Sequence, residues 1–221
     1  GTVLGGDGCG LIIDVGEGVP EGLIGKKASF VGASYQRYKC QALAGGLILL
    51  DDSQDLSKAA NAFINPLTVV AQIDLVKQKG SKAAIMTAAS SLAKQYLRLA
   101  DAEGYDTINI VRKDEQVKTL KEELNAKYVL NQTSPTFMAD LDEMIKLLNP
   151  TVLFEYLGGD LSGKIFERMP ATSVMHVVGN LSNTPLVVQS GDLIFKNKSI
   201  FGLFLSDWLR EQGAEVPKHL K

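Results

Sequence analysis

The sequence predicts an α/β protein in which an all-β portion precedes a doubly wound, parallel sheet. Glycines separate short β-rich runs over the first 60 residues, a texture typical of strands joined by tight turns. From Lys82 onward, near-continuous apolar runs alternate with amphipathic helical patterns. Such alternation indicates a parallel sheet covered by helices on both faces, and right-handed crossovers make that sheet doubly wound.

Bulk composition limits the class of protein. The chain has 221 residues, of which 45% are hydrophobic and 22% charged, as in globular proteins of one large or two small domains. The net charge of −2 and the lack of basic runs argue against nucleic acid as a partner. The apolar segment 42–50 is too short to span a bilayer, so we expect no transmembrane segment.

The cysteine content bears on the compartment. Cys9 and Cys40 make neither a disulfide framework nor a metal-ligand pattern, so we expect a reducing, intracellular compartment. The sequence leaves cytoplasm and mitochondrion open. The chain has no starting Met and opens inside a strand-like run, and we therefore expect a processed or incomplete protein.

The first 64 residues are expected to form one domain, part of a β-barrel. Four β-rich runs are expected as its strands, at 11–15, 27–31, 35–39 and 46–50. A barrel without all its strands has open edges, which a partner chain or further segments would need to cover.

Two helices are expected between this portion and the parallel sheet. Ser57 is expected to cap a helical stretch that runs toward Phe63. The second helix is expected from Pro66 to Lys79, because proline suits the first helical turn and Gly80 suits a helix end.

Residues 65–221 are expected to form the second domain. Six apolar runs predict its strands, at 83–86, 107–111, 128–130, 152–156, 174–178 and 199–203. Four amphipathic patterns predict helices between them, at 91–103, 114–124, 135–148 and 161–169. A ligand site in such a sheet is expected outside the carboxyl ends of the strands, where the strand order reverses.

The turn after the first of these strands, residues 87–93, carries the cofactor argument. It places a helix N-terminus where the phosphates of a nucleotide can bind. Alanine and serine stand where dinucleotide-binding turns usually have glycine, and a Cβ is unfavourable wherever φ must be positive. Ser90 or Ser91 could cap the helix or donate to a phosphate. The alternative is an ordinary capped turn that binds nothing.

The second strand of the sheet ends in Arg112 and Lys113. An NAD site usually has an acidic residue at this place, whereas a guanidinium is a planar, multidentate partner for a phosphate. The pair therefore favours NADPH over NADH. The alternative is a solvated basic pair before a helix that Asp114 caps.

Several segments together resemble the medium-chain dehydrogenase/reductase superfamily, and the resemblance covers nearly the whole chain in order. Segments 6–12 and 15–19 are similar to its GroES-like barrel, and segment 34–38 to the stretch before the nucleotide domain. Asn-Pro-Leu-Thr at 65–68 resembles the Asn-Pro-x-Thr of the zinc-free quinone and enoyl reductase branch. The matching strand ends of a Rossmann-type domain are 125–131, 156–159, 178–182 and 193–206.

The resemblance implies NADPH-dependent reduction of a conjugated carbonyl, such as a quinone or an enoyl thioester. Hydride passes from the nicotinamide to the acceptor, and the protein orients the two and stabilises the developing enolate. Asn65 and Thr68 would lie at the nicotinamide end as catalytic residues, and Asn65 is also expected to cap the helix before Pro66, in parallel with any catalytic use. The implied cofactor-binding residues are Ser90, Ser91, Leu92, Arg112, Lys113, Asn131, Gly179, Asn180, Phe204 and Leu205.

No metal site is expected. Gly6 stands where the zinc-dependent branch has a histidine, and Asn65 stands where it usually has a cysteine. His176 falls inside a predicted strand and is expected to be half-buried, and His219 lies near the end of the chain. Nitrogen and sulfur ligands at useful spacing are therefore lacking.

Two functional readings stay open at this point. The first is an active NADPH-dependent reductase that takes a small-molecule acceptor, with an enoyl-thioester reductase of lipid metabolism as a variant. The second is a catalytically inactive, reductase-like subunit that has lost the cofactor and serves a structural or binding role in a larger assembly. The resemblance also implies self-association as a homodimer through the last strand region.

Overall fold

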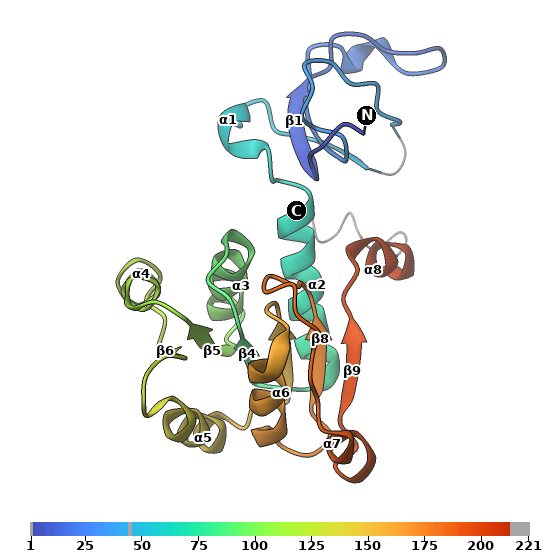
Figure 1. Ribbon diagram of the computed structural model, residues 1–221. Coiled ribbons are helices and arrows are strands. Elements are labelled where there is room, and N and C mark those ends of the chain that lie inside the picture. The colour runs from blue at the N-terminus through green and yellow to red at the C-terminus, as the bar shows by residue number, and fades with distance from the viewer. Residues whose placement is uncertain (1, 44–45, 213–221) are drawn as a thin grey trace. The chain divides into compact units, whose positions relative to one another are not determined.

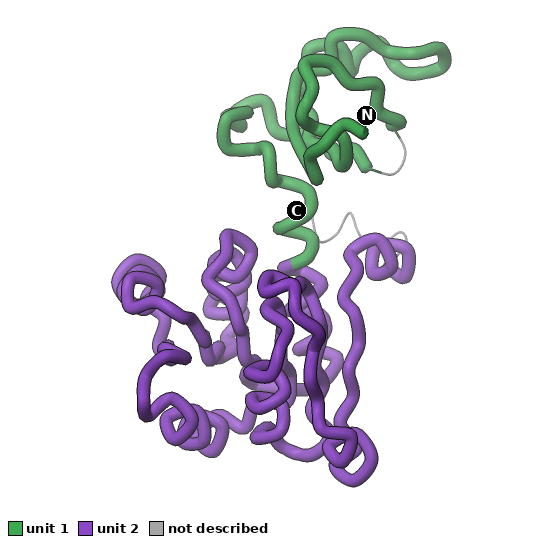
Figure 2. Tube along the Cα trace, viewed as in Figure 1, with its two compact units in different colours: residues 1–68 green, residues 69–221 purple. Residues whose placement is uncertain are grey.

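The computed structural model describes residues 2–43 and 46–212, and the chain divides into two compact units. Unit 1 comprises residues 1–68 and unit 2 comprises residues 69–221 (Figure 2). The last residue of the predicted site set, Leu205, lies within the described range, whereas His219 lies outside it.

Unit 1 contains a three-stranded antiparallel sheet in the order β1-β2-β3. Its strands are β1 (Asp7–Leu11), β2 (Lys27–Val31) and β3 (Leu47–Leu49), accompanied by the 3₁₀ turn η1 (Glu21–Leu23) and the short helix α1 (Leu56–Ala59). The expected strand at 11–15 is wrong, because β1 ends at Leu11. Glycine suits this strand since a Cβ on Gly8 would lie 3.2 Å from the Phe30 ring.

The expected strand at 35–39 is also wrong, because this segment forms no strand. The Lys39 side chain, and not a neighbouring strand, bonds to the carbonyl groups at the end of β2. Its ammonium donates to the carbonyls of Val31 and Gly32 and lies 4.8 Å from the centroid of the Phe30 ring. The β pattern of the segment thus belongs to a loop that contacts the end of β2 through Lys39.

Two predicted helix caps of unit 1 are replaced by aspartates. Asp55 caps α1 by accepting the backbone N–H of Ser57 at 2.9 Å, so Ser57 is not the cap. Helix α2 (Ile64–Lys79) begins two residues earlier than expected, and the N–H of Ile64 donates to the Asp7 carboxylate at 3.3 Å. Asn65 therefore lies inside the helix and does not cap it. The helix ends before Gly80, whose φ of +66° is favourable only for glycine, as predicted.

Unit 2 contains a six-stranded parallel sheet in the order β6-β5-β4-β7-β8-β9 (Figure 1). The strands are β4 (Ala83–Met86), β5 (Asp106–Val111), β6 (Tyr128–Asn131), β7 (Val152–Glu155), β8 (Val174–Val177) and β9 (Ser199–Gly202). The helices are α3 (Ser91–Ala102), α4 (Asp114–Leu124), α5 (Phe137–Leu148), α6 (Gly159–Arg168), α7 (Ser190–Phe195) and α8 (Leu205–Gln212). The doubly wound Rossmann-type fold is confirmed, although α7 and α8 were not predicted.

The two faces of this sheet are covered by different helices. Met86 and Phe154 pack with Val69 and Ile73 of α2 and with Tyr96 of α3. On the other face, the strand residues Ile85 and Leu153 pack with Leu141 of α5 and with Ile165 and Phe166 of α6. Alternate residues of each strand thus serve separate apolar cores, which explains why the strands read as continuous apolar runs.

Strand order reverses between β4 and β7, which are hydrogen-bonded neighbours with Met86 opposite Phe154. This is the switch point at which ligands bind in doubly wound sheets. Two turns flank it, the β4–α3 turn (residues 87–90) and the β7–α6 turn (residues 156–158).

Candidate functional site

The β4–α3 turn presents a row of unpaired backbone donors. The N–H groups of five consecutive residues, Ala88 to Leu92, donate no hydrogen bond within the described ranges 2–43 and 46–212. Ser90 caps α3, and its hydroxyl oxygen accepts the N–H of Ala93 at 3.2 Å. The next donor, Lys94 N–H, pairs with the Ser90 carbonyl. Together with the positive end of the helix dipole, the row can bind an anion such as a diphosphate.

The turn achieves this conformation without glycine. No residue from Thr87 to Ala93 has a positive φ, so the Cβ atoms of Ala88 and Ala89 carry no conformational penalty. The turn is fixed instead by Thr87, whose hydroxyl bridges the two strands of the switch point. It accepts the N–H of Tyr156 at 3.0 Å and donates to the Phe154 carbonyl at 3.4 Å.

Two cations follow the neighbouring strand, β5. Arg112 and Lys113 are exposed, and neither forms an ion pair with a described residue. Their backbone N–H groups both donate to the side-chain oxygen of Gln116, at 3.1 Å each. Asp114 does not cap α4, because its carboxylate accepts from Asn131 instead. The two side chains therefore lie exposed and without an ion pair to a described residue, at the edge of the sheet that the β4–α3 turn shares.

The β7–α6 turn is constructed differently, because a buried carboxylate fills it. Glu155 is 1% exposed, and its Oε1 accepts the N–H of Leu157 at 2.6 Å and that of Gly158 at 2.9 Å. The hydroxyl of Ser162 donates to the same oxygen at 2.6 Å. The backbone donors of Leu157 and Gly158 are therefore occupied by a side chain of the protein itself.

The segment after β8 forms a wall beside this turn. Gly179 N–H donates to the Glu155 carbonyl at 3.3 Å, and the next bonds run from Leu181 to Tyr156 and from Ser182 to Leu157. A Cβ on Gly179 would lie 3.4 Å from the Tyr156 carbonyl oxygen, so glycine permits the close approach. The predicted pair Gly179 and Asn180 therefore belongs to a rigid double loop at the carboxyl edge.

The other predicted residues of unit 2 lie farther along the same edge. Asn131 ends β6, donates to Asp114 at 2.6 Å and accepts from Thr133, so it stabilises its own turn. Phe204 and Leu205 follow β9 at the start of α8, and Phe204 is exposed. All ten predicted cofactor residues thus lie at the carboxyl ends of strands or at the start of the following helix, because parallel strands share that edge.

The two predicted catalytic residues belong to unit 1. Asn65 is half-buried in the first turn of α2, and its side chain has no hydrogen bond to a described residue. Thr68 is buried, and its hydroxyl donates to the Ile64 carbonyl at 2.7 Å. The amide of Asn65 is therefore the more available donor of the two.

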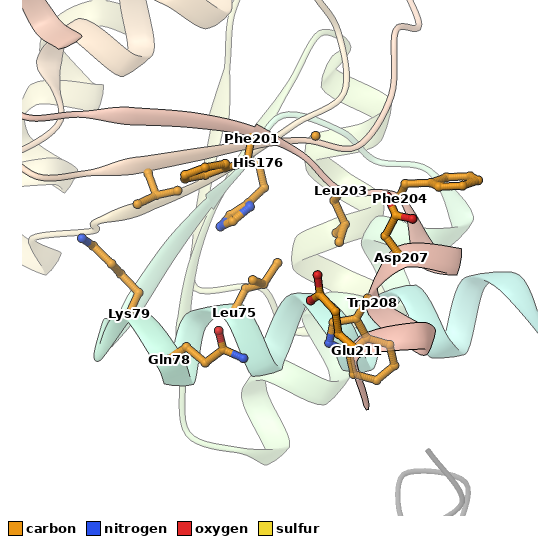
Figure 3. Close-up of a pocket in the computed structure, with 12 residues that line it drawn as sticks. Leu75, Gln78, Lys79, His176, Phe201, Leu203, Phe204, Asp207, Trp208 and Glu211 are labelled. Carbon is orange, nitrogen blue, oxygen red and sulfur yellow. The ribbon is translucent and has the colours of Figure 1, made fainter. Parts of the chain in front are cut away.

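A groove lies over the face of β8 and β9, between α2 and α8 (Figure 3). Its volume is about 480 Å³, and its lining includes Phe204, Trp208, Leu75 and His176. His176 is stacked between the rings of Phe154 and Phe201, at centroid distances of 5.9 and 6.2 Å. Burial lowers the pKa of His176 to about 4, so the imidazole is neutral at pH 7. The residue is more deeply buried than expected.

The described residues offer few candidate donors for a zinc ion. Within the described part of the chain, no three His, Cys, Asp or Glu side chains lie close enough to hold a metal. Asp7 is engaged at the start of α2, and Gly6 beside it offers no side-chain donor. No described helix is long and apolar enough to cross a membrane.

Sequence reasoning missed Glu155, Thr87 and Ser162. A signal for the first was present, since a single carboxylate interrupts the apolar run from Val152 to Tyr156 directly before a Gly-Gly pair. The donors that pair with it follow in the sequence at positions 157, 158 and 162, but only the fold turns them toward one oxygen.

Comparison with known proteins agrees with this architecture. Residues 90–220 match the family described as zinc-binding dehydrogenase. The mitochondrial enoyl-[acyl-carrier-protein] reductase of Rattus norvegicus is 24% identical over 99% of this chain and 61% of its own length. The human enzyme of the same name is 23% identical over 99% of this chain and 61% of its own length.

Two solved structures share the fold. A putative NADPH:quinone reductase from Mesorhizobium loti superposes with a TM-score of 0.86 and 34% identity, covering 98% of this chain and 64% of that one. A mutant enoyl thioester reductase from Candida tropicalis gives a TM-score of 0.80 with 19% identity, covering 99% and 67%. Unit 1 thus corresponds to part of a GroES-like domain, and the chain spans about 61% of the length of these curated relatives.

Proposed function

The chain belongs to the zinc-binding dehydrogenase family, within the medium-chain dehydrogenase/reductase superfamily, and we propose that it is an NADPH-dependent oxidoreductase. The observation that carries the proposal is the open row of amides from Ala88 to Leu92, beside the unpaired cations Arg112 and Lys113. A diphosphate needs the first and a ribose 2′-phosphate needs the second. The relatives named as enoyl and quinone reductases support the same activity.

We assign roles to the residues as follows. The amides of Ala88 to Leu92 would bind the diphosphate, and Arg112 and Lys113 would discriminate NADPH from NADH. NADPH, when bound, would supply a hydride for the β-carbon of a conjugated acceptor. Asn65 would orient the reacting groups through its free amide, with Thr68 supporting the same helical turn. The double loop at Gly179 and Asn180 would exclude water from one side of the bound cofactor.

The acceptor is proposed to be a conjugated carbonyl compound, either a quinone or an enoyl thioester, reduced without zinc. Residues 1–64 are assigned to the partial barrel and residues 65–221 to the cofactor domain. We propose a location in the mitochondrion or the cytoplasm. The relatives named as mitochondrial enoyl reductases support the first of these.

A homodimer is proposed as the assembly. Among the described residues, β9 has a strand neighbour on one side only. Phe201 of β9 is 57% exposed, and Ile194 and Phe195 of the preceding helix α7 are 68% and 85% exposed. An open parallel edge with apolar side chains favours pairing with a second copy.

Titration with NADPH and NADH, followed by cofactor fluorescence, tests the proposal. Saturable binding with NADPH preferred is expected, followed by NADPH oxidation on addition of a quinone or a crotonyl thioester. Binding of neither nucleotide would contradict the proposal and favour the inactive, reductase-like subunit. Binding without turnover of either acceptor would reject only the proposed acceptor class.

A further inference from the structure

We propose that Gln116 is a positioning residue for NADPH specificity, whose neutral side chain holds the segment of Arg112 and Lys113 in place without adding a charge that would repel the 2′-phosphate. The inference rests on the proposed function, because it takes that phosphate as the ligand of the two cations. Gln116 acts on the cofactor through Arg112 and Lys113, to which it is bonded.

The first argument is the way in which Gln116 holds this segment. Gln116 is the half-buried third residue of α4, and its Oε1 accepts the N–H groups of Arg112 and Lys113, both at 3.1 Å. The Gln116 N–H donates in turn to the Lys113 carbonyl at 3.0 Å. One residue is thus bonded to two consecutive ones through both its side chain and its backbone. These bonds fix the backbone from which the two cationic side chains extend.

The second argument is that the N-cap residue of α4 contributes no cap of its own. In a complete capping box, a serine or threonine at the N-cap bonds to the third residue of the helix, and the side chain of that third residue bonds back to the N-cap. Lys113 occupies the N-cap here, and an ammonium group has no acceptor for a backbone N–H. Only the bond from the side chain of Gln116 is therefore present. Loss of that side chain would deprive the N–H groups of Arg112 and Lys113 of their acceptor.

The third argument is the charge balance of the segment. The two cations after β5 are followed directly by Asp114 and Glu115, so these residues together carry no net formal charge. A glutamate at position 116 would offer the same acceptor to the two N–H groups, since glutamate and glutamine both suit this position of a capping box. It would also make the segment net negative and lie beside the cations that a phosphate needs. Glutamine therefore supplies the hydrogen bonds and leaves the charge of Arg112 and Lys113 uncompensated by its own side chain.

Gln116→Glu tests the effect of charge, because it keeps the acceptor. Its Tm should stay within about 2 °C of the wild-type value. Its affinity for NADPH should fall by about threefold to tenfold in a fluorescence titration, and that for NADH by less than about twofold, because only NADPH carries a 2′-phosphate. The loss should shrink in about 0.5 M sodium chloride, which screens exposed charges. Gln189→Glu adds the same charge at an exposed glutamine before α7 and should change neither affinity.

Gln116→Met tests the effect of the hydrogen bonds, because it removes the acceptor at similar length and adds no charge. Its Tm should fall by about 2–4 °C, and its affinity for NADPH by about twofold to fivefold, because the backbone that carries the cations is no longer held. The affinity for NADH should change by less than about 1.5-fold. In the R112A/K113A protein, the same substitution should weaken NADPH by less than about 1.5-fold, since a positioning residue has no effect once the groups that it positions are gone.

The proposal is overturned if either Q116E or Q116M keeps the wild-type preference for NADPH, or if either variant loses affinity for both nucleotides equally, as a purely structural role would predict. It is also overturned if Q189E lowers the preference as much as Q116E does. If the wild-type protein prefers NADPH and only the Gln116 variants depart from these expectations, the proposed function stands and this inference fails. If the wild-type protein binds neither nucleotide, or both equally, the proposed discrimination fails and the inference fails with it.

Discussion

The two turns at the switch point follow neighbouring strands and lead into helices, yet their backbone N–H groups differ in whether they have an acceptor. The β4–α3 turn leaves the amides of Ala88 to Leu92 without partners. In the β7–α6 turn, the N–H groups of Leu157 and Gly158 donate to the Glu155 side chain. The Thr87 hydroxyl accepts the N–H of Tyr156 and so joins the two turns.

The distribution of glycine between the turns is the reverse of what a dinucleotide fingerprint suggests. The β7–α6 turn contains Gly158 and is followed by Gly159, both at positive φ, whereas the β4–α3 turn contains no glycine and no positive φ. At this turn, glycine therefore marks a place where backbone segments approach closely, since a Cβ on Gly158 would lie 2.5 Å from the Thr184 carbonyl oxygen. Capacity for an anion depends on unpaired donors and on the absence of a built-in acceptor.

Blocking one open amide should have the largest effect on the cofactor. Ser91 is the first residue of α3, where proline fits the helix but removes the N–H, and Ser90 has a φ and ψ of −69° and 171° that suit a residue before proline. We expect Ser91→Pro to weaken NADPH binding by about tenfold to a hundredfold in a fluorescence titration, because a hydrogen bond to a charged group is lost.

Ser190→Pro is the matched control for this variant. Ser190 is the exposed first residue of α7 and is preceded by Gln189 in an extended conformation. The same substitution there should leave NADPH affinity unchanged. Equal losses of NADPH affinity in the two variants would show that the β4–α3 turn has no special role in cofactor binding.

Removal of the cation at the end of β5 should have the next largest effect, and it separates the two nucleotides. Arg112→Ala is expected to weaken NADPH by about tenfold and NADH by less than about twofold, because only NADPH carries a 2′-phosphate. Lys118→Ala, which removes an exposed cation of α4 paired with Glu122, should change neither. Equal losses of NADPH and NADH affinity in R112A would contradict the role of Arg112.

Uncoupling the two turns should affect stability more than cofactor binding. Thr87→Val keeps the shape of the side chain but leaves the buried N–H of Tyr156 without its acceptor. We expect a loss of about 1–3 kcal/mol in the free energy of unfolding, measured by urea denaturation, with NADPH affinity within about threefold. Thr133→Val, at an exposed threonine, should change stability by less than about 0.5 kcal/mol. A T87V protein as stable as the wild type would show that the bridge is dispensable.

The parallel sheet could be predicted from the sequence to within about two residues, because each strand is a buried apolar run and each long helix has one apolar face. The strands of unit 1 could not, since Gly8 and Gly10 disguise β1 as a turn and Lys39 replaces a strand ladder with its side chain. The β pattern at 35–39 records aromatic residues in a loop, not a strand.

The candidate site divides in the same way. Capping by Ser90 and the position of Arg112 beside it follow from local spacing and from the edge that parallel strands share. The contacts of Glu155 could not be predicted, because they depend on the geometry that brings Ser162 to the oxygen already bonded to Leu157. The predicted caps Ser57 and Asn65 were wrong for a related reason, since Asp55 accepts the N–H of Ser57 and Asp7 accepts that of Ile64.

Backbone NMR of the ¹⁵N-labelled protein, titrated with NADPH and separately with pyrophosphate, tests the contrast between the two turns most directly. The account predicts that the amide resonances of Ala88 to Leu92 shift most with either ligand, while those of Leu157 and Gly158 stay bonded to Glu155 and move little. Larger shifts at Leu157 and Gly158, or none at Ala88 to Leu92, would contradict it.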